Sequence, residues 1–339
     1  DASGNCLGLL VEEARTNVLT RSNEFLTAPW NGDAEIVASS IPSIAGGQCF
    51  KISSNGGAAD YWIQSGVASN GQRKSIWART VSGTGTAHIL GHNSVSATLV
   101  TLTEEWQRFS LNVGAGEAGG THIYAVDFRG SGTLSEILVF GAQVETGAFP
   151  TSYIPTSGST VTRAADVASL PVERFAYNQA QGSVVVEAVM PPSVISEQFW
   201  ILGSNTDSAR WAYSNSGDVG LNAYDGAGTF YVAPLQPSAT QKMAIGTDQS
   251  TTILCLDGVS GNQSSTNGNI SSLTTVFYFG GNWSTPVVNF NGHIKHIQYY
   301  PKRLSNTELQ LLTQPSASPT MNLTFDGQAT STLVEGLHD

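Results

Sequence analysis

Carboxylates are the first candidates for chemistry here, because hydrolysis of a glycosidic bond needs two of them facing each other across that bond. The sequence contains the adjacent pairs Glu12–Glu13 and Glu104–Glu105, and Glu187 stands alone in an apolar run. Neighbouring residues on a strand point to opposite faces, so neither pair can converge on one substrate. We therefore predict structural or solvent-facing roles for these glutamates, and no enzyme activity.

Other catalytic and metal-binding signatures are also missing from the sequence. It contains neither a Gly-x-Ser-x-Gly nucleophile elbow nor a phosphate-binding P-loop. His293 and His296 are three residues apart, which on a regular strand puts them on opposite faces and disfavours a shared metal ion. The three cysteines are far apart, so we expect no disulfide framework, and we expect Cys49 and Cys255 to be buried free thiols.

Aromatic and short polar side chains in turn-like segments offer a different chemistry, the binding of sugars. Aromatic rings can stack on the apolar faces of pyranose rings, and polar side chains held on loops can bond the hydroxyl groups. Such segments gather in the second half of the chain, whereas Trp30, Trp77, Trp106 and Trp200 fit packing roles. The candidate glycan-binding residues are Trp211, Tyr224, Asp225, Asn282 and Trp283.

Calcium is the one cofactor that the sequence leaves open. Carboxylate oxygens on loops are suitable calcium ligands, and three aspartates occur in the same turn-like segments. These calcium candidates are Asp207, Asp218 and Asp225. No other cofactor is expected.

Strands must position all of these side chains. Most of the sequence consists of short runs rich in Val, Ile, Thr, Phe and Tyr, separated by Gly, Asn, Ser and Pro. In residues 73–79, Ile76 and Ala78 alternate with polar residues, which is typical of a strand with one apolar face. The predicted fold class is all-β, with two β-sandwich (jelly-roll) domains in tandem and one short helix near the end of the second.

The boundaries follow from proline, glycine and capping signals. Residues 1–20 are an N-terminal strand and connector, 21–150 the first sandwich, 151–168 a proline-containing linker, and 169–314 the second sandwich. A helix is predicted from Leu304 to Leu312, because Ser305 and Glu308 form a capping-box pattern and Leu304, Leu309 and Leu312 share a face. The polar segment 315–339 is expected to lead into a further segment.

The composition excludes two classes of partner. The 339 residues carry a net charge of −11, and only 12% of them are charged. An acidic surface repels phosphate backbones and anionic membranes, so we expect no nucleic-acid partner. No apolar run approaches the roughly 20 residues of a membrane-spanning helix, so no membrane insertion is expected either.

Two long motifs resemble bacteriophage tail-fibre and head-fibre (spike) proteins. The first motif covers residues 8–19 and continues through 21–25 to Pro29–Trp30; the second covers 141–145, 149–156 and 161–166. In those proteins the two motifs bracket a domain that looks like a carbohydrate-binding-module jelly roll. Residues 291–300, 303–305 and 308–309 are similar to the end of concanavalin-A-like, laminin-G-like sandwiches. Catalytic members of that fold use a Glu-x-Asp-x-x-Glu pattern, which is absent here.

The resemblance implies a non-catalytic fibre or spike segment on the virion surface that recognises a host cell-surface glycan. It also implies contacts with other virion proteins and a homo-oligomer, for example a trimer. Two alternatives stay open: a purely structural virion protein without a ligand, and a polysaccharide depolymerase. The second of these lacks the necessary set of carboxylates.

Overall fold

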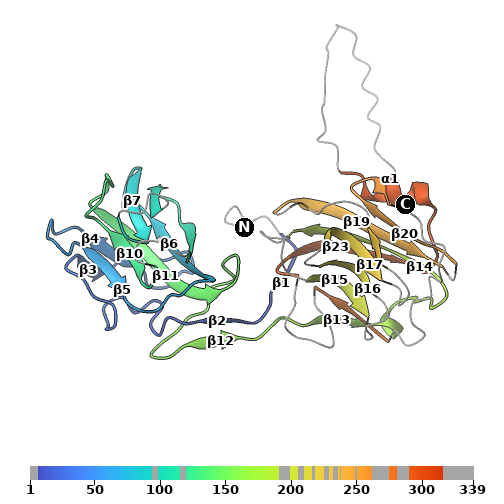
Figure 1. Ribbon diagram of the computed structural model, residues 1–339, viewed down its shortest axis with the longest axis horizontal. Coiled ribbons are helices and arrows are strands. Elements are labelled where there is room, and N and C mark those ends of the chain that lie inside the picture. Colours follow the sequence, from blue (N-terminus) through green and yellow to red (C-terminus); the bar gives the residue numbers. More distant parts are fainter. Residues whose placement is uncertain are drawn as a thin grey trace, which may run out of the picture.

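The computed structural model describes residues 7–93, 98–114, 120–190, 199–204, 210–215, 218–224, 229–231, 236, 238–248, 250–261, 275–280 and 290–315, with backbone only from 199 to 231. Nearly all of this chain forms strands, and Figure 1 shows them gathered into two bodies joined by a narrow ribbon. The predicted all-β class with two sandwiches and one short helix is confirmed. Within the described residues, no helix has the length and apolar character needed to cross a membrane.

The first sandwich stacks a five-stranded sheet on a four-stranded sheet. In spatial order, the five-stranded sheet contains β3 (Glu35–Ala38), β4 (Phe50–Ser53), β11 (Glu136–Thr146), β6 (Gln72–Arg79) and β9 (Gln107–Asn112). The four-stranded sheet contains β5 (Tyr61–Gln64), β10 (Ile123–Asp127), β7 (Gly85–Leu90) and β8 (Leu99–Leu102).

The core of the first sandwich forms because alternate residues of each strand face the opposing sheet. Ile76 and Ala78 of β6 are buried there, as their spacing predicts. Trp30 is also buried, and its indole N–H donates to the carbonyl of Arg21. Trp77 and Trp106 join an apolar cluster around Cys49, separate from this core, so the packing role predicted for these three tryptophans is confirmed.

The second sandwich is made of two six-stranded sheets. One contains β1 (Leu9–Val11), β23 (Gly292–Tyr300), β14 (Gly182–Val189), β19 (Thr240–Thr247), β20 (Thr252–Leu256) and β21 (Val259–Ser260). The other contains β13 (Ala168–Pro171), β22 (Val276–Phe279), β15 (Phe199–Ser204), β16 (Arg210–Asn215), β17 (Asp218–Tyr224) and β18 (Thr229–Tyr231). A short 3-10 helix, η2 (Val172–Arg174), follows β13.

The N-terminal strand β1 therefore belongs to a sheet whose other members all come from residues 182–300. Leu9 pairs with Ile294 and Val11 with Gly292, in antiparallel register. Val11 is fully buried in the core of the second sandwich, where it packs against the backbone of Gly280. The segment predicted as an N-terminal strand and connector thus supplies an edge strand to the sheet formed by residues 182–300.

A two-stranded ribbon joins the two sandwiches. It pairs β2 (Arg15–Asn17) with β12 (Val161–Arg163), so both chain passages between the sandwiches lie side by side. Glu12 and Asp166 exchange hydrogen bonds at 2.9 Å, and the guanidinium of Arg163 lies 3.3 Å from the Glu12 carboxylate. The segment predicted as a linker, 151–168, is therefore held against residues near the N-terminus.

The bulge in β23 reverses one expectation about its side chains. Glu187 pairs with His296 but Ala188 pairs with Ile294, so Lys295 is an extra residue in the strand. The extra residue puts Ile294 and Ile297 together on the core side. By the same count His293 and His296 share the outer face, so the predicted opposite placement was wrong.

Helix α1 (Asn306–Thr313) covers the outer face of the sheet that contains β19 and β20 (Figure 1). The predicted capping box is confirmed, since Glu308 N donates to the Ser305 hydroxyl and Ser305 N donates to the Glu308 carboxylate. Leu304 and Leu309 are buried beside the free thiol of Cys255, while Leu312 is exposed. Cys49 and Cys255 are both buried and unpaired, as predicted.

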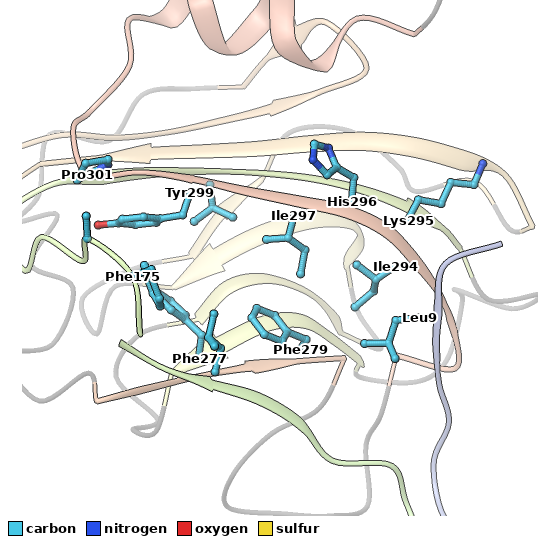
Figure 2. Close-up of a pocket in the computed structure, with 13 residues that line it drawn as sticks. Leu9, Phe175, Phe277, Phe279, Ile294, Lys295, His296, Ile297, Tyr299 and Pro301 are labelled. Atoms are coloured by element: carbon cyan, nitrogen blue, oxygen red, sulfur yellow. The ribbon is translucent and has the colours of Figure 1, made fainter. Parts of the chain in front are cut away.

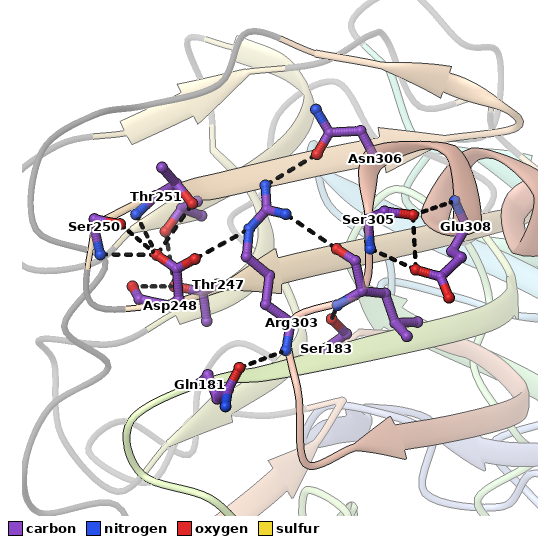
Figure 3. Close-up of polar contacts among 12 residues, drawn as sticks. Gln181, Ser183, Thr247, Asp248, Ser250, Thr251, Arg303, Ser305, Asn306 and Glu308 are labelled. Atoms are coloured by element: carbon purple, nitrogen blue, oxygen red, sulfur yellow. Dashed lines mark hydrogen bonds and ion pairs between the residues drawn. The ribbon is translucent and has the colours of Figure 1, made fainter.

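A polar network fixes this helix to the turn between β19 and β20 (Figure 3). One carboxylate oxygen of Asp248 accepts from the backbone and side chains of Ser250 and Thr251 at 2.7–3.1 Å. The other oxygen lies 3.6 Å from Nε of Arg303, whose Nη2 donates to Asn306 at the start of α1. Burial alone would raise the pKa of Asp248, but these donors outweigh it and lower the pKa.

Candidate functional site

The structure describes only two of the five residues predicted to bind a glycan, Trp211 and Tyr224, and of these only the backbone. Trp211 lies in β16 and Tyr224 at the end of β17, and the register of these neighbouring strands pairs Arg210 with Tyr224. The backbones of Trp211 and Tyr224 are therefore close, while their side chains lie outside the described part. Asp225, Asn282 and Trp283 also lie outside the described residues, so their role stays a prediction.

The side chains of the three predicted calcium ligands are not described either. Asp218 opens β17, but its side chain is not described, and Asp207 and Asp225 lie outside the described residues. Within the described part, no group of three or more His, Cys, Asp or Glu side chains could hold a metal ion.

A cluster of aromatic and polar side chains lies instead on the outer face of the four-stranded sheet in the first sandwich. We call it the outer-face cluster. It contains Tyr61, His92, His122, Tyr124, Asp127 and Arg129.

A β-bulge brings the members on β10 to the same face. Tyr124 pairs with Ile63 and Asp127 with Tyr61, although the two β10 residues are three apart and the two β5 residues only two apart. Ala125 and Val126 between them both turn into the core. On a regular strand without a bulge, two residues three apart such as Tyr124 and Asp127 would lie on opposite faces of the sheet.

The Tyr124 ring is the centre of this cluster. Its centroid lies 5.9 Å from the rings of Tyr61 and His92 and 6.2 Å from that of His122, all edge-to-face. Edge-to-face contacts hold rings in defined orientations, because the positive edge of one ring meets the negative face of the next. Tyr124 itself is buried, so it serves as the base on which the three half-buried outer rings rest.

Asp127 and Arg129 fix the polar part of the cluster. Nε and Nη2 of Arg129 donate to the two oxygens of Asp127 at 2.9 and 2.8 Å, and Asn93 N donates to the same carboxylate at 3.1 Å. Burial opposes ionisation of Asp127, but these hydrogen bonds prevail and lower its pKa. The paired guanidinium carbon lies 4.2 Å from the centroid of the Tyr61 ring, a cation–π contact.

His88 lies beside Asp127, on the neighbouring strand β7. It is buried, its Nε2 accepts from Ser131 N at 3.3 Å, and its Nδ1 lies 3.2 Å from the Thr98 hydroxyl. These partners suit a neutral ring with the proton on Nδ1. Burial lowers the pKa of His88, and the Asp127 carboxylate only partly offsets this effect.

The outer-face cluster combines aromatic rings, imidazoles, a guanidinium and a carboxylate. It offers half-buried rings for stacking and guanidinium and imidazole groups for hydrogen bonds. Its one carboxylate, Asp127, is committed to Arg129 and Asn93. Glu12 and Glu187 elsewhere are likewise engaged, with Arg163 at 3.3 Å and Lys295 at 3.9 Å. The sequence signal for the cluster was limited to isolated Tyr and His residues in strand patterns, and the predictions missed it.

The second sandwich contains an apolar pocket of about 560 Å³ between its sheets. Figure 2 shows Phe175, Phe277, Phe279, Ile297 and Tyr299 arranged around it. The lining is mostly apolar; it also includes Lys295 and His296, whose side chains point away from these rings.

No protein-family model matches this chain, and no curated protein sequence matches it. Among solved structures, it is similar to domain 4 of an extracellular arabinanase from Geobacillus stearothermophilus, in complex with arabinotriose, at 15% identity and a TM-score of 0.36, covering 50% of this chain and 84% of that one. It is also similar to the CBM40 of the Ruminococcus gnavus IT-sialidase bound to α2,3-sialyllactose, at 17% identity and a TM-score of 0.34, covering 41% and 84%. A third is the SAP-like pentraxin of Limulus polyphemus, at 12% identity and a TM-score of 0.32, covering 42% and 70%. Structural similarity at these TM-scores does not indicate which ligand this chain binds.

Proposed function

We propose that this chain is a non-catalytic, glycan-binding segment of a bacteriophage fibre or spike. The outer-face cluster is the observation that carries the binding part of this proposal. It combines three half-buried rings with a guanidinium that is held in place by a bidentate ion pair.

The chemistry of the cluster matches that of a sugar. A pyranose ring has apolar faces that stack on aromatic rings, and hydroxyl groups that accept hydrogen bonds from N–H donors. Tyr61 and His122 supply rings, and Arg129 supplies donors that cannot lose their charge at physiological pH. Because rigid strands hold Tyr61 and Tyr124, less freedom is lost on binding than with mobile loops.

The virion assignment rests on the two sequence motifs that resemble fibre proteins. In the structure these motifs meet: Asn17 in the first donates to the carbonyl of Ile154 in the second, and β2 pairs with β12. A host cell-surface glycan would be the ligand, with other virion proteins and further copies of the chain as partners on the particle surface.

Binding of the full chain to a panel of bacterial surface polysaccharides tests the proposal. We expect Tyr61→Ala to weaken binding at least about tenfold, as for a buried aromatic contact. Tyr61→Phe keeps the ring and is the matched control, with an expected change below about threefold. Circular dichroism of each variant separates loss of binding from loss of folding.

Three results would contradict the proposal. Absence of binding to every host polysaccharide would remove the adhesin role. Loss of binding in Trp283→Ala but not in Tyr61→Ala would move the site to the second sandwich, where the sequence placed it. Release of reducing ends or unsaturated sugars would instead indicate a depolymerase.

A further inference from the structure

One edge of β23 is only partly covered. β1 pairs with Gly292, His293 and Ile294, whereas the remaining six residues of β23 have β14 on one side and, within the described part of the chain, no strand on the other. An uncovered strand presents a row of backbone N–H and C=O groups that can pair with another strand.

The geometry of Gly8 explains why β1 ends where it does. Gly8 has φ of +100°, outside the extended region, so a regular strand cannot continue through it. A β-carbon at this position would lie 2.4 Å from the carbonyl oxygen of Ile294, so only glycine fits there. Within the described residues, the regular pairing of β1 with β23 therefore begins at Leu9.

The apolar pocket lies beneath the same uncovered edge. Ile297 and Tyr299 line it from β23, and Leu170 and Phe279 line it from β13 and β22 of the facing sheet. Leu9 and Leu170, on the edge strands of the two sheets, are 50% and 38% exposed. Exposed leucines beside an apolar pocket are unfavourable in water unless something covers them.

We propose that this edge is a binding site for an extended segment of another polypeptide, which adds as a strand beside residues 295–300. Backbone hydrogen bonds to β23 would supply affinity, and side chains at alternate positions would enter the pocket. β1 shows the same arrangement within the chain, because it pairs with β23 while Leu9 lines the pocket.

The lining indicates the chemistry of the segment. Lys295 and His296 belong to the lining, but their side chains point away from the aromatic rings, so the part of the pocket beside these rings is apolar (Figure 2). The pocket volume of about 560 Å³ suits several apolar side chains, and the uncovered stretch would span roughly 20 Å of strand. We therefore expect a segment of about six residues with Val, Ile, Leu or Phe at every second position.

A synthetic strand peptide tests the proposal on the full chain. The probe is a peptide of about nine residues in which valine and threonine alternate between terminal lysines. We expect it to bind, and we expect Leu170→Lys to weaken binding at least about tenfold by placing a charge at the pocket mouth. Val259→Lys is the matched control, because Val259 is 59% exposed on β21, the opposite edge of the same sheet. It should leave peptide binding unchanged.

The backbone and the pocket are tested separately. An analogue methylated at its backbone nitrogens cannot donate to β23, and we expect it not to bind. Absence of peptide binding, or equal binding of the methylated analogue, would overturn the proposal. Binding of the apolar dye anilinonaphthalene sulfonate that the peptide does not displace would make the pocket a small-molecule site and also overturn it. Self-association of the chain, if Leu170→Lys abolished it, would also overturn the proposal. None of these results depends on glycan binding by the first sandwich.

Discussion

Asn17 is completely buried, and its side chain uses its full hydrogen-bonding capacity. Nδ2 donates to the carbonyls of Ile154 and Ala142, and Oδ1 accepts from the backbone N–H groups of Val144 and Leu19. A single amide thus joins the end of β2 to residues 142–144 and to Ile154. Both motifs that resemble fibre proteins meet at this side chain.

Replacement of Asn17 by leucine should therefore be costly. Asn17→Leu keeps the volume but leaves buried backbone groups without partners, and we expect a loss of about 3 kcal/mol or more in the free energy of unfolding. Urea denaturation followed by tryptophan fluorescence measures it. Thr16→Val is the control, because the Thr16 hydroxyl bonds the exposed Thr162 hydroxyl across the ribbon, and a change within about 0.5 kcal/mol is expected. Equal effects of both variants would contradict this role of Asn17.

His88 predicts how stability changes with pH. Its pKa in the folded protein is lowered by burial, so as pH falls below the unfolded value of about 6.5 the unfolded chain takes up the proton first. Stability is therefore lost on acidification, and the half-buried His293, whose pKa is also lowered by desolvation, acts in the same direction. We expect NMR titration to place the pKa of His88 below 6.5.

The matching variant is His88→Gln. Its free energy of unfolding should fall less than that of the natural protein between about pH 7.5 and pH 5.5, with His293 still contributing. A titration of His88 at or above its ordinary pKa would contradict the neutral, buried ring described here.

At the scale of elements, bulges decide which side chains share a face. In β23 the extra residue Lys295 separates Ile294 from Ile297, so its removal restores simple alternation and keeps both isoleucines in the core. We expect deletion of Lys295 to cost less than about 1.5 kcal/mol, since only an outward-facing side chain is lost. Urea denaturation measures the change.

Deletion of Gln298 in the same strand is the matched comparison. It would turn Tyr299 outward and Tyr300 inward, and it would break the aromatic contact of 5.0 Å between Tyr299 and Phe175. We expect a loss above about 3 kcal/mol. If the two deletions are equally harmful, the register of β23 described here is wrong.

Bulges also explain which parts of the structure could be predicted from the sequence and which could not. Alternation in residues 73–79 correctly predicted the buried face with Ile76 and Ala78, and Ser305 with Glu308 correctly predicted the helix start. Both signals are local. Lys74 shares the buried face of β6 and is fully buried, donating to the carbonyl of His122, which no local pattern indicates. The outer-face cluster was missed for a related reason, because a bulge aligns Tyr124 with Asp127 against strict alternation.

At the scale of the whole molecule, β1 makes the second sandwich discontinuous in sequence. Val11→Ala should therefore destabilise a region formed by residues near 290, and we expect a loss of about 2 kcal/mol from the cavity. Hydrogen exchange measured by mass spectrometry should show faster exchange in β22 and β23 and no change in β10 or β11. Ile52→Ala, in the core of the first sandwich, should give the reverse pattern. Faster exchange confined to the first sandwich in Val11→Ala would contradict this assignment.

The position of β1 also has a consequence during synthesis. Leu9 is synthesised about 285 residues (294 − 9) before its partner Ile294. At translation rates of roughly 5–20 residues per second, β1 must wait tens of seconds without its partner strand. Its three-residue length limits the apolar edge that is presented during this delay. The first sandwich can complete its core in the meantime, so the order of synthesis favours folding of the two sandwiches in succession.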